Sequence, residues 1–531
     1  MEQNRTQKHT VVLVPLPLQG HITPMLQLGN ILYSKGFSIV VAHSEFRPPN
    51  PLNHPEFIFH PLSDNLSGYQ ASSNNLVELI LAINSNCRAP LEDYMVQLME
   101  DQKLQGYQVA CIIYDSHLCF VDSVATHLKI PGIILRPDMA VYMLAFRYFC
   151  QLEAENRIPF PGSRLQEPVP ELHPLRFKDL PYPITNEIPE WIMDFFASSV
   201  NIRSSVAIIL NTTDCLEHST LSQLQQCYKV PCFPIAPLHK LGAAATSTSF
   251  LEEDQSCIAW LEKQPPNSVL YISFGSIACV NEQELTETAW ALGNSGIPFI
   301  WVLRSDSIDG SQLEDHFPEA VKALLGERGL IVKWAPQKKV LAHSAVGGFW
   351  SHCGWNSTIE SICEGVPMIC RPHFADQLSN ARYLTSEWKV GLEIENVLDR
   401  GSIEISIRRL MVDAEGKEMR QRMSVMKDKL EAGLQKGGSS YESLNDLTEF
   451  ISQLPSMVQE VKVDDPATSE DLDHPYVGES ARVQAINGRL SLQNYLFGSV
   501  VGRRRSVAAR ILNSDSGSHI IKKDEVGEEG S

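Results

Sequence analysis

The chain has 531 residues, of which 43 % are hydrophobic, so it is long enough to bury at least two sizeable cores. Its 44 Lys and Arg residues against 63 Asp and Glu residues give a formal net charge of −19. That balance disfavours nucleic acid or an anionic membrane as the main partner.

The beginning of the chain reads as a first strand, not as a signal peptide. A polar start, MEQNRTQKHT, precedes a short apolar run broken by two prolines, VVLVPLPL. No later stretch reaches the roughly 18 uninterrupted apolar residues of a spanning helix. Twelve cysteines are scattered without a Cys-x-x-Cys pair, which indicates neither a zinc site nor a redox dithiol. We therefore expect a cytoplasmic protein with no integral membrane segment and no nucleic-acid partner.

Short β-branched runs alternate with helical patterns, which is typical of doubly wound, mostly parallel sheets. The first series predicts strands at 10–17, 38–43, 109–115, 130–136 and 206–211. A stretch rich in Ala, Ser, Thr and Gly then interrupts the alternation. The second series predicts strands at 268–275, 298–304, 329–334, 345–352 and 367–372, before a last amphipathic helix at 441–454. Two successive α/β halves, each with its own sheet, follow from this order.

These changes in pattern predict four segments. They are an N-terminal lobe at 1–236, a linker at 237–256, a C-terminal lobe with its closing helix at 257–454, and a tail at 455–531. The tail is mostly charged and polar, so we expect it to be largely disordered and assign it no function.

Two polar residues follow strands of the first series and are candidates for acid–base chemistry. His21 comes just after the first strand, ahead of Pro24 at a position that can open a helix, and Asp115 ends another strand. Ligands of open parallel sheets bind beyond the carboxyl ends of the strands. There an imidazole can take a proton while a carboxylate fixes its tautomer. The alternative is that His21 is a surface residue and that Asp115 caps the next helix.

The stretch HCGWNST, residues 352–358, lies between an apolar strand pattern and a helical one. It therefore places polar side chains at a helix N-terminus, where free N–H groups favour an anion such as phosphate. Asn356 or Ser357 could instead cap the helix, and Ser357 with Glu360 fits a capping box. Dinucleotide-binding, P-loop and α/β-hydrolase glycine motifs are absent from the sequence.

Residues 334–377, WAPQKKVLAHSAVGGFWSHCGWNSTIESICEGVPMICRPHFADQ, closely resemble the signature box of the plant family-1 UDP-dependent glycosyltransferases, the plant secondary-product glycosyltransferases. The match runs for 44 residues without a gap, and the wider resemblance covers about residues 8–454. It implies the glycosyltransferase B fold: two Rossmann-like lobes facing each other across a cleft, with donor in the C-terminal lobe and acceptor mainly in the N-terminal lobe.

The resemblance also implies roles for individual residues. Trp334 would stack on uracil, the Ala335 backbone would read the uracil edge, and Gln337 and Glu360 would bind the ribose. His352, Asn356, Ser357 and Ser276 match positions that contact the diphosphate. Trp355, Asp376 and Gln377 match positions around the donor sugar, and the final Gln resembles that of glucose-using members.

The reaction implied is an inverting, metal-independent transfer of glucose from UDP-glucose to a small lipophilic acceptor, giving a β-glucoside. His21 would be the base and Asp115 its orienting partner. No cofactor or metal is expected, and the protein is expected to be a monomer. A member that forms glucose esters or N-glucosides, and a non-catalytic nucleotide-sugar-binding protein, remain alternatives.

Some features do not follow the family pattern or leave the acceptor open. Trp350 stands where the box is more often aliphatic, and the tail is longer than usual in the family. Residues 137–149 and 181–196 are rich in Met, Tyr, Phe and Trp, which favours an apolar acceptor pocket without identifying the acceptor.

Overall fold

The computed structural model describes residues 9–69, 76–182, 188–242, 249–278, 281–304, 328–394 and 398–460. Most of the predicted tail, from residue 461 onward, lies outside the described residues, as does the 243–248 part of the predicted linker. A short helix, α8 (Leu238–Leu241), begins that linker range.

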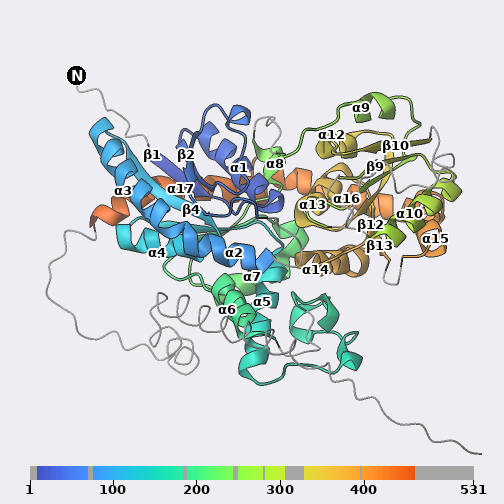
Figure 1. The fold of residues 1–531 in the computed structure, drawn as a ribbon, viewed down its shortest axis with the longest axis horizontal. Coiled ribbons are helices and arrows are strands. Elements are labelled where there is room, and N and C mark those ends of the chain that lie inside the picture. The colour runs from blue at the N-terminus through green and yellow to red at the C-terminus, as the bar shows by residue number, and fades with distance from the viewer. Residues whose placement is uncertain are drawn as a thin grey trace, which may run out of the picture. The chain divides into compact units, whose positions relative to one another are not determined.

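Two parallel β-sheets follow one another along the chain, which confirms the predicted fold class (Figure 1). The first has the order β3-β2-β1-β4-β5-β6-β7, formed by Ile58–Leu62, Ser38–Ser44, His9–Val14, Gln108–Asp115, Gly132–Arg136, Ala207–Leu210 and Cys232–Pro234. The second has the order β10-β9-β8-β11-β12-β13, formed by Gly329–Val332, Phe299–Val302, Val269–Ser273, Val346–Ser351, Met368–Cys370 and Gly391–Glu393.

Three strands that the sequence patterns missed, β3, β7 and β13, all lie at sheet edges. An edge strand is covered on fewer sides, so it carries a weaker apolar signal, and it tolerates proline. The edge strand β3 contains Pro61, and its Ile58 side chain is 55 % exposed. The central strands were found because they are buried on both faces.

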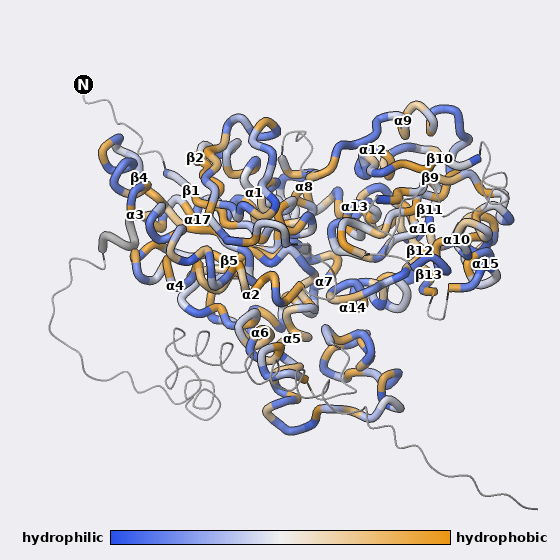
Figure 2. The backbone as a smooth tube through the Cα atoms, in the orientation of Figure 1, coloured by the Kyte–Doolittle hydropathy of each residue, from blue (hydrophilic) through white to orange (hydrophobic). Residues whose placement is uncertain are grey.

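Alternate residues of the first sheet enter two different cores, as the two-residue period of a strand requires. Val11 and Leu13 of β1 pack beneath α1 (Gln19–Ser34) and α17 (Ser439–Glu460). Val12 and Val14 face the opposite layer, which contains α2 (Leu76–Asn86), α3 (Arg88–Gln105), α4 (Cys119–Leu128), α5 (Ala140–Ala154), α6 (Glu190–Val200) and α7 (Asp214–Cys227). Figure 2 shows the hydrophobic residues concentrated along the strands between these layers.

The second sheet is also covered on both faces. One face packs against α10 (Glu282–Ser295) and α15 (Arg400–Met411), and it includes Trp350, which is fully buried and meets the Phe274 ring edge-on at 5.6 Å. The other face packs against α12 (Gln337–Ala342), α13 (Trp355–Glu364) and α16 (Ala414–Leu434). α9 (Ser256–Leu261) lies against α12, and α14 (Asp376–Arg382) follows β12.

The direction of strand order reverses at one point in each sheet. In the first sheet this point lies between β1 and β4, and in the second between β8 and β11. A crevice opens at such a point because the connections on its two sides leave in opposite directions. The residues after these four strands are therefore the ones to inspect for a ligand site.

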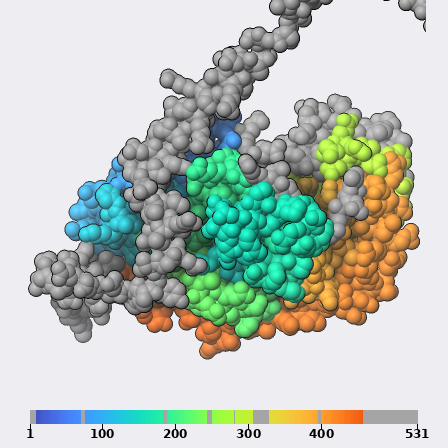
Figure 3. Space-filling view, turned by 90° about the horizontal axis from the view of Figure 1, so that it is seen from below, coloured from blue at the N-terminus to red at the C-terminus, as the bar shows by residue number. Residues whose placement is uncertain are grey.

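Two segments pack against the lobe to which they do not belong in sequence. α17 follows the second sheet yet packs against β4 and β7 of the first, and it ends at Glu460, within the range assigned to the tail. η4 (Phe177–Asp179) belongs to the first half of the chain yet lies against α14. Figure 3 shows the teal segment that contains η4 next to the orange second half of the chain. There Ser379 Oγ donates to the Asp179 carbonyl at 2.9 Å.

Candidate active site

His21 and Asp115 meet at the switch point of the first sheet. Asp115 is the last residue of β4, and His21 lies in the first turn of α1. α1 begins at Gln19, so Pro24 lies inside the helix and does not open it, contrary to the prediction. His21 Nδ1 lies 2.8 Å from Asp115 Oδ2, and the His21 side chain is 23 % exposed against 1 % for Asp115.

The other carboxylate oxygen of Asp115 also has a partner. Oδ1 accepts the backbone N–H of His117 at 3.0 Å. This bond closes a turn that precedes α4. It is not an N-cap, because α4 begins at Cys119. Asp115 is therefore held by a backbone bond on one oxygen while it binds His21 with the other. The carboxylate requires a hydrogen on His21 Nδ1, which leaves a lone pair on Nε2.

The electrostatics of the pair follow from this contact. Burial alone would lower the pKa of His21, but the Asp115 charge and hydrogen bond outweigh it and raise the pKa above its ordinary value. Burial would likewise raise the pKa of Asp115, but His21 lowers it. The arrangement can accept a proton at Nε2 and stabilise the resulting imidazolium.

The switch point of the second sheet brings together the loop after β8 and the N-terminus of α13. The α13 N-cap is Gly354, which has no side chain to cap the helix, so the capping alternative for Asn356 and Ser357 is not found. The N–H groups of the first turn and the positive end of the helix dipole therefore remain available to an anion. Ser276 lies in the opposite loop and lines the same cavity.

His352 lies between these two elements. Burial lowers the pKa of His352 to about 3, so the ring is neutral and offers a single N–H. The adjacent loop turns at Gly275, which has a φ of +74°. A Cβ at Gly275 would collide with the His352 imidazole, so glycine is needed there for both conformation and space.

Gln337 connects Glu360, which is assigned to the ribose, with Ser357, which is assigned to the diphosphate. Its Nε2 donates to Glu360 Oε2 at 2.8 Å and to Ser357 Oγ at 3.0 Å, while Tyr271 donates to its Oε1 at 3.2 Å. Burial raises the pKa of Glu360. Trp334 and Ala335 line the cavity beside this cluster.

α14 presents Asp376 and Gln377 to the same cavity. Asp376 Oδ2 accepts from Asn380 at 2.9 Å, and burial together with the Asp138 charge raises the pKa of Asp376 to about 6. Gln377 Oε1 accepts the backbone N–H of His373 at 2.9 Å, so the Gln377 amide can offer its N–H groups to a ligand.

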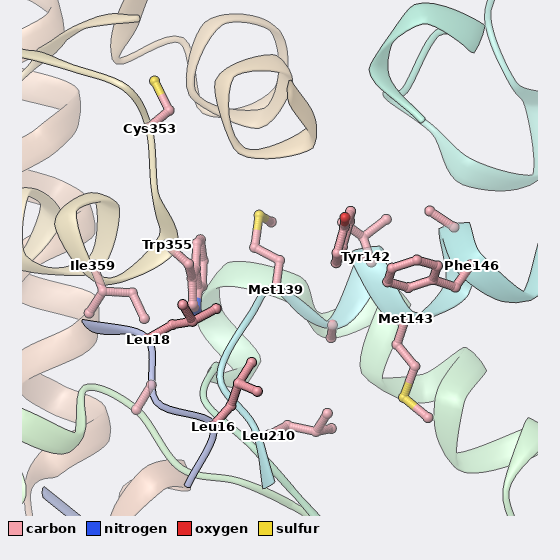
Figure 4. Packing of buried hydrophobic residues seen from close by; sticks show 14 of the residues in the cluster. Leu16, Leu18, Met139, Tyr142, Met143, Phe146, Leu210, Cys353, Trp355 and Ile359 are labelled. Atoms are coloured by element: carbon pink, nitrogen blue, oxygen red, sulfur yellow. The ribbon is translucent and has the colours of Figure 1, made fainter. Parts of the chain in front are cut away.

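Trp355 and Asn356 join the two lobes. Trp355 Nε1 donates to the Asn211 carbonyl at 2.6 Å, and Figure 4 shows the Trp355 indole beside Leu18. Asn356 Nδ2 donates to the Gly20 carbonyl at 2.9 Å. That carbonyl is free because Pro24, four residues later in α1, has no N–H to offer it.

One cavity of about 1070 Å³ contains the predicted site. All predicted site residues line it except Asp115, which lies behind His21. Its aromatic wall includes Tyr142, Phe146, Trp191, Phe195 and Phe196, which come from the two segments predicted to contact an acceptor. Residues 183–187 of the second segment lie outside the described residues.

Sequence reasoning missed two charged residues at this site. Asp138 lines the cavity and binds Arg136 through both carboxylate oxygens, at 3.2 and 2.8 Å. Arg304 follows β9 and donates to the carbonyls of Gly275 and Ala278, which holds the loop after β8. Both residues follow strand ends, so the rule that selected Asp115 could have selected them.

Comparisons with known proteins identify the family. Residues 56–430 match the family model described as "UDP-glucoronosyl and UDP-glucosyl transferase". The chain belongs to this family. Among curated relatives, UDP-glycosyltransferase 76E1 of Solanum lycopersicum is 54 % identical over 450 residues, covering 85 % of this chain and 94 % of the relative. The flavonol 3-O-glucosyltransferase UGT76E12 of Arabidopsis thaliana is 43 % identical over 459 residues, covering 85 % and 99 %.

Solved structures show the same glycosyltransferase B fold. TcCGT1 in complex with UDP has a TM-score of 0.72 at 27 % identity, covering 85 % of this chain and all of that one. A UDP-glucosyltransferase from Polygonum tinctorium that glucosylates indoxyl has a TM-score of 0.71 at 26 % identity, covering 85 % and 99 %. The protein is thus a plant family-1 UDP-glycosyltransferase, as the signature box predicted.

No helix within the described residues is long and apolar enough to cross a membrane. No group of three or more His, Cys, Asp and Glu side chains in this part of the chain could hold a metal ion.

Proposed function

We propose that this UDP-glycosyltransferase transfers glucose from UDP-glucose to a hydroxyl of a small lipophilic acceptor and inverts the anomeric configuration. The observation that carries the proposal is the His21–Asp115 contact of 2.8 Å at the wall of the cavity that Asp376 and Gln377 also line. The name of the relative UGT76E12, a flavonol 3-O-glucosyltransferase, supports both glucose and a hydroxyl acceptor.

In this mechanism the acceptor hydroxyl gives its proton to His21 Nε2 as its oxygen attacks the anomeric carbon. The bond from that carbon to the diphosphate oxygen breaks, and UDP leaves from the opposite face. Asp115 stabilises the imidazolium that forms. The His21–Asp115 pair thus supplies the base, and the α13 N-terminus faces the charge that develops on the leaving group.

The donor sites proposed for this chain are those that the family resemblance implies. Trp334 and Ala335 hold uracil, and Gln337 and Glu360 hold the ribose. Ser276, His352, Ser357 and the backbone N–H of Asn356 hold the diphosphate. Asp376, Gln377 and Trp355 surround the sugar. Charge compensation by the helix dipole and by hydrogen-bond donors supports a reaction without metal or cofactor. A cytoplasmic location and a monomeric state remain part of the proposal.

The test is mass-spectrometric detection of products from UDP-glucose and a panel of phenolic, terpenoid, carboxylate and azole acceptors. Wild type is compared with His21→Ala, and with His218→Ala as a matched control at an exposed position on α7. We expect glucosides of hydroxyl acceptors from wild type and the control only. Carboxylate or azole products that persist in His21→Ala would assign the ester- or N-glucoside-forming alternative. UDP binding without any product would favour the non-catalytic binder.

A further inference from the structure

Another histidine of the cavity wall, His117, has no part in the mechanism above. It follows Asp115 in the connection between β4 and α4, and its ring centroid lies 5.7 Å from that of His21. The ring stacks on Phe195 at 5.3 Å with an interplanar angle of 22°. The Phe146 ring meets it edge-on at 6.3 Å. His117 therefore belongs to the aromatic wall, next to the proposed base.

The hydrogen bonds of Ser199 determine which nitrogen of His117 carries a hydrogen. Ser199 Oγ donates to the Phe195 carbonyl at 2.8 Å, which uses its only hydrogen. Towards His117 Nδ1, at 3.0 Å, the same oxygen can then only accept. Nδ1 must therefore carry the hydrogen of the ring.

The other nitrogen, Nε2, is consequently a hydrogen-bond acceptor. Burial lowers the pKa of His117 to about 3 despite the nearby Asp115 carboxylate, so the ring is neutral and has only one N–H. Within the described part of the chain Nε2 has no hydrogen-bond partner. It is also absent from the fully buried side-chain atoms that lack a partner, so Nε2 itself is not fully buried. The partly exposed side chain thus presents a lone pair to the cavity.

We propose that His117 selects acceptors that carry a second hydrogen-bond donor beside the reacting hydroxyl. This inference rests on the proposed function, because it assumes that the first hydroxyl is bound at His21. Two adjacent imidazoles, each with an Nε2 lone pair, suit two adjacent hydroxyl groups, one losing its proton to His21 and the other donating to His117. The aromatic wall around them favours an aromatic vicinal diol, that is, a catechol.

The test uses 4-methylcatechol and 4-methylphenol, which differ only in the second hydroxyl. We expect wild type to prefer the catechol by about 10-fold in kcat/KM, as one hydrogen bond of ordinary strength allows. The preference is also measured by calorimetry, as the ratio of the dissociation constants of the two probes for enzyme saturated with UDP. That measurement needs no turnover, so it remains informative even if the proposed transfer reaction fails, whereas His21→Ala should abolish turnover of both probes.

Two variants separate acceptor selection from a structural role of His117. The amide of His117→Asn can replace Nδ1–H and keep the Ser199 contact but has nothing at the Nε2 position, so the preference should fall to about 1. The longer amide of His117→Gln reaches the Nε2 position and should retain part of the preference. A wild type that binds both probes equally, or binds neither, would overturn the proposal. Full preference in His117→Asn, with loss only in His117→Gln, would also overturn it.

Discussion

Replacing Asp115 by Asn tests the proposed base more sharply than replacing His21. Asp115 accepts one hydrogen bond on each oxygen, from the His117 N–H at 3.0 Å and from His21 Nδ1 at 2.8 Å. An Asn has only one accepting oxygen, so it cannot serve both donors. If that oxygen keeps His117, the amide N–H groups face Nδ1 and put the hydrogen on Nε2, where the lone pair is needed.

The size of the effect follows from these contacts. Loss of the charge-assisted hydrogen bond costs the imidazolium about 1.5–3 kcal/mol, which is roughly a 10- to 150-fold lower rate. The wrong tautomer removes general-base catalysis as well, which is worth about 10²–10⁴. We therefore expect kcat to fall by about 10² to 10⁴ in Asp115→Asn.

The pH dependence of kcat/KM provides the second readout. His21 acts as a base only when neutral, and its pKa is raised above 6.5, so activity of the wild type should decline below a pH that lies above 6.5. Without the Asp115 charge, burial lowers the pKa of His21, so in Asp115→Asn this decline should move to lower pH.

The matched control for this substitution is Asp122→Asn. Asp122 is also buried, but it accepts the Ser204 N–H and Oγ–H through a single oxygen, Oδ1, which an Asn can keep. It should retain most of the activity. A rate for Asp115→Asn within about 5-fold of wild type, with the decline at the same pH, would refute the assignment of the base.

The remaining predictions concern the donor side. Ser357→Ala should weaken UDP binding about 10-fold in calorimetry, through loss of a hydrogen bond to a charged group, and unchanged affinity would contradict its phosphate role. Gly275→Ala should weaken it at least as much as His352→Ala, because its Cβ displaces the imidazole; an affinity equal to that of wild type would show that the loop can shift. Asn356→Ala should lower kcat about 10-fold with UDP affinity kept, because its amide holds Gly20 beside His21; a selective loss of UDP affinity would instead assign its side chain to the phosphates. A metal chelator should leave the rate unchanged, and a loss restored by Mg²⁺ would overturn the metal-free reaction.

The parts of the fold that could be predicted are those with a local signal. Central strands such as β4 and β11 are continuous apolar runs, whereas β3 carries Pro61 and an exposed Ile58 that disguise it. His21 and Asp115 could be paired because parallel strands end at the same edge of a sheet. The residues assigned to the donor could be placed on one cavity wall, most of them from the long signature box.

The rest depends on contacts between distant residues, which local patterns do not contain. The Asn356–Gly20 bond joins residues 336 positions apart, and the tautomer of His117 depends on Ser199, 82 positions away. The start of α13 at Trp355 could be predicted, but the choice between helix capping and anion binding could not. Asn356 and Ser357 look like capping residues in sequence, whereas in the structure the N-cap is Gly354 and the Trp355 indole donates to the Asn211 carbonyl in the other lobe.

The position of α17 has a consequence for the order in which the protein is made. Leu444, Leu447, Ile451 and Leu454 complete the core on one face of the first sheet. At translation rates of about 5–20 residues per second, they emerge roughly 10–40 s after β7, the last strand of that sheet. During this interval the newly made sheet lacks the helix that covers it, so nascent chains halted before α17 should be cleaved by protease more readily than chains halted after it. The first lobe of this transferase is therefore finished last.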